Sequence, residues 1–124
     1  MIKERYVSHK VAKLLRDKRF DEECSKTYDI KTGQMYIGGG LCNSDFTDID
    51  EMITAPTQQM ACDWLIENYK IYINVSFVSG KGYVGTICDI SDFDNAFDIV
   101  ETKYYSYIEP VYNAALKYVL TNLI

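Results

Sequence analysis

The strongest constraint on the fold comes from an alternating segment that is followed by a glycine-containing turn. Apolar residues at 71, 73, 75 and 77 alternate with polar or aromatic residues, which is the period of a half-buried strand. The segment Ser79 to Gly82 then predicts a turn into a second strand over 83–90. The chain must therefore form an antiparallel hairpin with one apolar face, and other elements must cover that face.

The length of the turn decides which side chains share that face. A four-residue turn pairs Val78 with Tyr83, and the same register places Ile73 opposite Cys88. The pairs on the predicted apolar face are Phe77 with Val84, Val75 with Thr86, Ile73 with Cys88, and Ile71 with Ile90. Residues 97–101 are expected to return as a third strand after an acidic turn.

Three segments have helical periodicity. The last is the clearest, because apolar residues recur at i, i+3, i+4 and i+7 from 108 to 123 behind the capping-box spacing of Ser106 and Glu109. Ser8 is expected to cap a first helix. A second helix is expected to have Pro56 in its first turn and to end at about Tyr69.

The remaining segments complete an α+β order. Residues 26–30 and 34–37 are predicted to pair as a hairpin, and 38–53 are predicted to form the longest loop. The element order is then α-β-β-α-β-β-β-α, with a mostly antiparallel sheet of about five strands packed against three helices. The length of 124 residues suits a single domain, 1–124.

Composition excludes several classes of protein. No segment has the h-region of a signal peptide or the length of apolar sequence that crosses a bilayer, so we expect a cytoplasmic protein. The four cysteines are about twenty residues apart without a CxxC pair, so we expect reduced thiols, no metal and no cofactor.

Charge is unevenly distributed along the chain. The net charge is −5, yet residues 3–19 carry seven basic side chains against two acidic ones, which gives +5 there and −10 elsewhere. Lys10, Lys13 and Arg16 on the first helix are therefore candidate contacts to an anionic ligand or an acidic partner. A solvated basic face is the alternative interpretation.

No catalytic set is evident, so we do not expect an enzyme. His9 is the only histidine and is expected to be exposed on its helix, and nothing near Cys42 in sequence would lower the pKa of that thiol. Gly38, Gly39 and Gly40 could offer backbone amides to a phosphate, but they lack the spacing of a nucleotide-binding loop. A flexible loop is the alternative.

Tyrosine is abundant, with 11 residues in the chain. Tyr104, Tyr105 and Tyr107 cluster just before the last helix and are candidate partner contacts, because tyrosine combines a large apolar area with a polar end. Structural use at the edge of the core is the alternative. The surrounding acidic sequence disfavours a nucleic-acid partner, because it would repel the phosphates.

Two strings of the sequence are distinctive. They are Ala55-Pro56-Thr57-Gln58-Gln59-Met60 with Trp64-Leu65, and the ending from Ala114 to Ile124. Both resemble segments of a group of small uncharacterised proteins encoded by phages and mobile elements of gut anaerobes. The opening segment from Tyr6 to Cys24 looks like theirs as well. The resemblance implies a phage or mobile-element setting, but it implies no activity, cofactor or site residue.

These observations rank three functions. The first is a non-catalytic accessory protein of a phage or mobile element that binds a host or phage protein. The second is a binder or sponge for a small anionic ligand, such as a nucleotide signal used in host defence, which would be received by the basic helix and the glycine run. A small enzyme of unknown type is third. No membrane partner is expected, and a homo-oligomer is left open.

Overall fold

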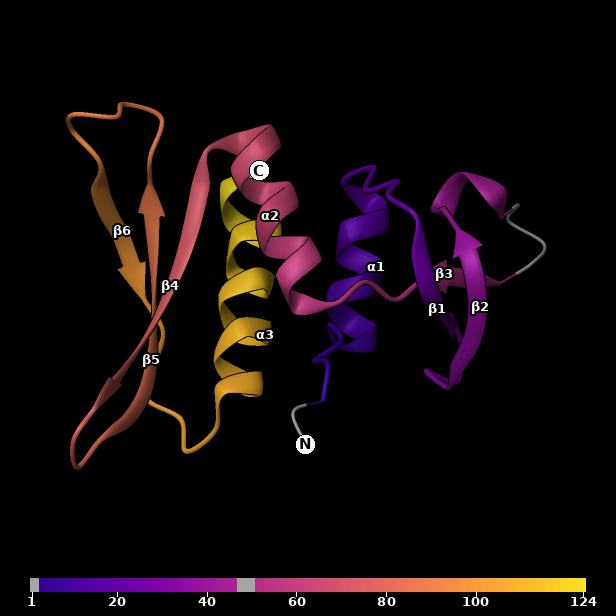
Figure 1. Cartoon of the computed structure of the whole chain (residues 1–124), viewed down its shortest axis with the longest axis horizontal. Helices are drawn as coiled ribbons and strands as arrows, with labels where there is room; N and C mark the ends of the chain where they lie inside the picture. Colours follow the sequence, from indigo (N-terminus) through magenta and orange to yellow (C-terminus); the bar gives the residue numbers. More distant parts are fainter. Residues whose placement is uncertain (1–2, 47–50) are drawn as a thin grey trace. The chain divides into compact units, whose positions relative to one another are not determined.

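The fold is α+β, as expected, but its strands do not form one sheet. The computed structural model describes residues 3–46 and 51–124, and the chain divides into two compact units, Met1–Thr57 and Gln58–Ile124 (Figure 1). Each unit contains a three-stranded antiparallel sheet within the described residues. The prediction of a single five-stranded sheet is therefore wrong, and each unit is described by itself.

The first unit places one helix against a small sheet. Its elements are α1 (His9–Asp17), β1 (Cys24–Asp29), β2 (Met35–Leu41), a 3₁₀ turn (Asn43–Asp45) and β3 (Met52–Thr54), and the sheet order is β2-β1-β3. Ser8 caps α1 as predicted, because its side-chain oxygen accepts a hydrogen bond from the Val11 amide at 3.2 Å. The largest fully buried apolar side chains of this unit are Val7, Val11, Leu15, Phe20 and Ile53.

The predicted loop over 38–53 is wrong at both of its ends. Gly38, Gly39 and Gly40 belong to β2, where they form a bulge: Lys26 pairs with Ile37, and Cys24 pairs with Leu41. Residues 52–54 form β3, which is too short for its alternation to be recognised in the sequence. Residues 47–50 of the predicted loop lie outside the described residues.

The second unit contains the predicted meander and two helices. Its elements are α2 (Gln58–Tyr69), β4 (Ile71–Val78), β5 (Gly82–Asp89), β6 (Phe97–Glu101) and α3 (Ile108–Tyr118), and α3 continues as a π-helical turn (Val119–Leu123). The sheet order is β4-β5-β6, and Figure 1 shows both helices on one side of this sheet. Trp64, Leu65, Ile73, Leu116 and Val119 are buried in this unit, whereas Val75 is only half-buried.

The register of the β4–β5 hairpin differs by one residue from the prediction. Val78 pairs with Gly82, and Ile73 lies opposite Ile87 instead of Cys88. The reason is the turn, which has three residues and closes with a hydrogen bond from the Lys81 amide to the Val78 carbonyl at 3.0 Å. Gly80, at φ +81°, supplies the left-handed conformation that this short turn needs.

The helix starts of the second unit also differ in detail from the prediction. α3 begins at Ile108 with Tyr107 as its N-cap and without a side-chain cap, so the capping box expected from Ser106 and Glu109 is wrong. Pro56 precedes α2 instead of lying in its first turn. The ends are better predicted, because α2 ends at Tyr69 as expected.

Candidate binding surface

The strongest candidate surface lies at the turn of the β4–β5 hairpin, where the segment after β6 runs beside β5. Tyr83 and Tyr105 exchange two backbone hydrogen bonds of 2.8 and 2.9 Å. Thr102 donates its amide to the Gly85 carbonyl at 2.8 Å, and its hydroxyl accepts the Gly85 amide at 2.9 Å. These four bonds fix residues 102–105 against the hairpin.

Gly82 permits this close approach. A side chain at this position would collide with the backbone carbonyl of Tyr105, and the φ of +107° is one that residues with a Cβ rarely adopt. The absence of a side chain at Gly82 therefore brings the tyrosine segment onto the hairpin.

Aromatic and basic side chains gather on this support. The rings of Phe77 and Tyr83 meet edge to face with centroids 5.1 Å apart. The ammonium group of Lys81 lies 5.4 Å from the ring centroid of Tyr104, and a similar pair at 5.3 Å joins Lys103 to Tyr105. We call this surface the tip patch and define it by its seven residues, Phe77, Lys81, Tyr83, Lys103, Tyr104, Tyr105 and Tyr107.

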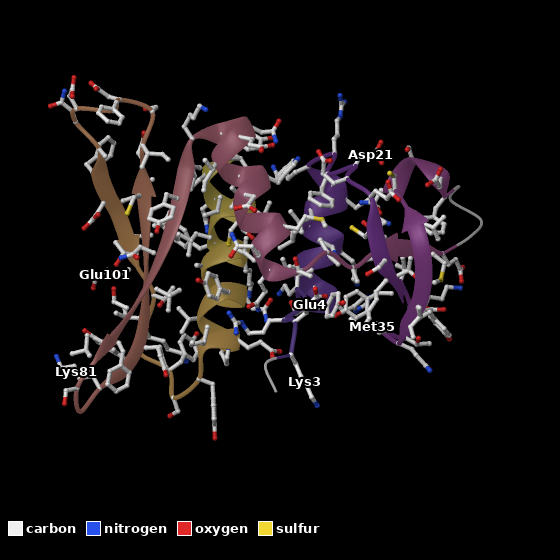
Figure 2. The ribbon with its side chains drawn as sticks, in the orientation of Figure 1. Lys3, Glu4, Asp21, Met35, Lys81 and Glu101 are labelled. Carbon is white, nitrogen blue, oxygen red and sulfur yellow. The ribbon has the colours of Figure 1, made fainter. Side chains whose placement is uncertain are left out.

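The tip patch is open to solvent. Phe77 is 64% exposed, Tyr107 is 74% exposed and Tyr104 is 41% exposed. Figure 2 shows Lys81 at the turn of the hairpin, with Glu101 farther along the sheet. Exposed tyrosine rings are typical of surfaces that bind proteins, because they offer a large contact area and lose little conformational entropy on binding.

Sequence reasoning found only part of the patch. The three predicted tyrosines lie in it, whereas Phe77, Lys81 and Tyr83 were assigned to the hairpin alone. Phe77 was expected on the covered face, but burial decreases along β4 from Ile71 toward the turn. The signal that could have found these residues is the position of Phe77 next to the turn, where a covering helix has least to contact.

A small depression lies beside the tip patch. Its volume is about 120 Å³, well below the range of roughly 300 to 1,000 Å³ that is usual for small-molecule sites. This depression could accept one side chain of a partner protein more readily than a nucleotide. Its lining residues are Ile87, Val100, Glu101, Thr102, Lys103, Tyr105, Ala114 and Tyr118.

The other predicted site residues lie in the first unit. Lys10, Lys13 and Arg16 lie on α1, where Lys13 is half-buried and Arg16 forms an ion pair with Asp17 at 3.2 Å. The carboxylate of Glu23 lies close to Gly40, and a Cβ added at Gly40 would be 2.6 Å from it. A carboxylate in this position repels an anionic ligand at the glycine run.

Cys42 follows the glycine run and lies in an acidic environment. Its thiol pKa is raised by burial first, and then by the negative charges of Asp21, Asp45, Glu23 and Glu22. A raised pKa leaves less thiolate at neutral pH, which is opposite to what a nucleophilic cysteine requires.

His9 is not the exposed helix residue that was expected. Its ring is half-buried and packs edge to face on Tyr28 at 5.6 Å, with Gly33 against its Nδ1 side. The Nε2 atom is buried and has no hydrogen-bond partner in the described structure. Gly33, at φ +74°, permits the close packing on the Nδ1 side, because a Cβ at this position would lie 3.2 Å from that atom.

The sulfur and acidic side chains give no sign of a metal centre. All four cysteines are free thiols. Within residues 3–46 and 51–124, no group of three His, Cys, Asp or Glu side chains is arranged to hold a metal ion. In that same part of the chain, none of the helices combines the length and the apolar character needed to cross a membrane.

Comparison with known proteins adds no relative. The sequence matches no protein-family profile, and no curated protein and no solved structure is significantly similar to it.

Proposed function

We propose that this chain is a non-catalytic accessory protein of a phage or mobile element, and that it binds a host or phage protein in the bacterial cytoplasm through the tip patch. The observation that carries the proposal is the exposure of Phe77, Tyr104 and Tyr107 around one hydrogen-bonded end of the β4–β5 hairpin. A cluster of large exposed aromatic side chains is typical of a protein-binding surface, because a partner that covers the rings removes their apolar area from water.

The charges of the patch indicate what the partner should present. Lys81 and Lys103 place two positive charges beside the rings in a chain whose net charge is −5. An acidic and apolar surface would meet both features, since carboxylates pair with the lysines and apolar groups cover the rings. A nucleic acid is disfavoured, because the net charge of the whole chain repels phosphates.

The two other functions receive less support. A small anionic ligand would meet the carboxylate of Glu23 at the glycine run, and the depression beside the tip patch holds about 120 Å³. An enzyme would need an activated group, but the thiol pKa of Cys42 is raised, and the ring of His9 packs against Tyr28 and Gly33.

The test compares capture of a partner by two variants of the purified chain. Tyr104→Ala with Tyr107→Ala removes two exposed rings of the tip patch, and Phe93→Ala removes one ring that is 96% exposed at the opposite end of the sheet. A photoreactive phenylalanine analogue at position 107 identifies the protein in contact. We expect the double variant to lower the affinity for that protein at least about tenfold, and Phe93→Ala to leave it unchanged.

Two results would contradict the proposal. One is a captured protein that binds the double variant and the wild type equally well. The other is the same cross-linked product formed equally well by the analogue at position 93, because that result would show that any exposed aromatic ring binds the protein nonspecifically.

A further inference from the structure

The edge strand β4 is unusual among the edges of the two sheets. β6 carries Asp98 and Glu101 and has a register shift within its pairing with β5, β2 contains the glycine bulge, and β3 has three residues. Charges, bulges and short length are the features that prevent edge strands from pairing with other chains. β4 has none of them: its eight residues, IYINVSFV, pair with β5 without a bulge and include no charge, glycine or proline.

The free side of β4 can be assigned residue by residue. The Ile90 amide donates to the Lys70 carbonyl at 3.0 Å, so the hydrogen-bonded pairs between β4 and β5 involve even-numbered residues of β4. On the other flank of β5, the bonds of Tyr83 and Gly85 to residues 105 and 102 agree with this alternation. The amides and carbonyls of Ile71, Ile73, Val75 and Phe77 therefore point away from β5, and within the described residues β5 is the only strand that β4 pairs with.

We propose that this edge pairs with β4 of a second copy of the chain, antiparallel about a two-fold axis at Asn74. This register pairs Ile71 with Phe77 and Ile73 with Val75 of the second copy, so all four outward-pointing residues of each copy can form backbone hydrogen bonds. The two copies would share about eight such bonds and make one continuous six-stranded sheet.

The side chains favour a second copy over an unrelated segment. Across the axis, the exposed ring of Phe77 lies beside Ile71, and the exposed ring of Tyr72 lies beside Ser76. No charged residue of β4 faces a like charge, because residues 71–78 carry none. The edge is thus complementary to itself in hydrogen bonding, in apolar surface and in charge.

A disulfide test follows from the position of the axis. Asn74 would face its own counterpart in a non-hydrogen-bonded pair with Cα atoms about 4.5 Å apart, which lies within the range for a disulfide. Ser76, which is exposed on the same face, would be about 13 Å from its counterpart, because four residues separate the two along the strand. Both substitutions are made in a Cys88→Ser background, since Cys88 also lies on this face.

We expect Asn74→Cys to form a covalent dimer under mild oxidation and Ser76→Cys to remain monomeric. Equal cross-linking of the two variants, or cross-linking of Ser76→Cys alone, would overturn the register and with it the proposed dimer.

A charge test measures the same contact without covalent chemistry. Asn74→Lys places two lysines against each other at the axis, and Asn74→Glu places two glutamates there. Because like charges then face each other, each variant should weaken dimerisation at least about tenfold. Analytical ultracentrifugation over protein concentrations from about 1 μM to about 1 mM measures the difference. Mixing the two variants should restore association, because opposite charges then face each other. Ser76→Lys is the matched control and should dimerise as the wild type does.

The proposed dimer and the tip patch share Phe77, but their tests are separate, because Asn74 is not a tip-patch residue and Tyr104→Ala with Tyr107→Ala leaves β4 unchanged. A wild-type chain that stays monomeric up to about 1 mM would overturn the inference. A monomer that binds an added extended peptide at this edge would overturn it as well and would assign the edge to a different occupant.

Discussion

Replacing Ile87 or Cys88 by alanine tests the register of the central hairpin. Ile87 is 0% exposed and lies opposite Ile73 under the helices, so Ile87→Ala removes a fully buried side chain and leaves a cavity. The expected loss is about 2 to 5 kcal/mol in the free energy of unfolding. Cys88 is half-buried on the other face, where its thiol donates to Asp98 at 3.3 Å, so Cys88→Ala should cost under about 1 kcal/mol.

The chain contains its own reporter for this comparison. Trp64 is the only tryptophan, lies in the same unit and is 7% exposed, so its fluorescence follows unfolding of that unit in urea. We expect the urea midpoint to fall strongly for Ile87→Ala and little for Cys88→Ala, with similar slopes. A larger loss for Cys88→Ala would refute the observed register and favour the four-residue turn.

Three further results are expected. Gly82→Ala should destabilise the chain much more than Gly80→Ala, because both positions have positive φ but only Gly82 would also collide with the Tyr105 backbone; urea unfolding measures the difference. Changing Lys10, Lys13 and Arg16 together to glutamine should alter the free energy of unfolding by less than about 1 kcal/mol, as a solvated helix face predicts, and a larger loss would show that these side chains support the fold. The rate of Cys42 alkylation should rise with pH around a midpoint above that of an unstructured cysteine, because the pKa of the Cys42 thiol is raised. Asp21→Asn should lower that midpoint, since it removes one of the negative charges that raise the pKa. A midpoint below that of an unstructured cysteine would contradict the acidic environment.

The sequence predicted elements whose periodicity extends over many residues. The last helix, the β4–β5 hairpin and the strand at 97–101 are confirmed because each has several apolar residues at regular spacing. β3 was missed because three residues do not show a period, and the glycine run was predicted as loop because a bulge in a strand has the same local composition as a turn.

The candidate surface was only partly predictable for a different reason. The clustering of Tyr104, Tyr105 and Tyr107 is visible in the sequence, but their position beside Phe77 depends on hydrogen bonds between residues about twenty positions apart. The close approach at Gly82 that permits those bonds gives no sequence signal beyond the glycine itself. Contacts of this kind follow from three-dimensional packing and not from local pattern.

The three-residue turn between Val78 and Gly82 has a consequence for how this chain can vary. Side chains alternate between faces along β5, so an inserted residue that kept the turn at three residues would turn Ile87 outward and present Cys88 and Thr86 to the helices. An inserted residue that lengthened the turn would keep the strand pairs and the faces as they are. Insertions in natural variants of this hairpin should therefore lie in the turn, at residues 79–81, and an alignment of relatives would show gaps there and not within β4 or β5.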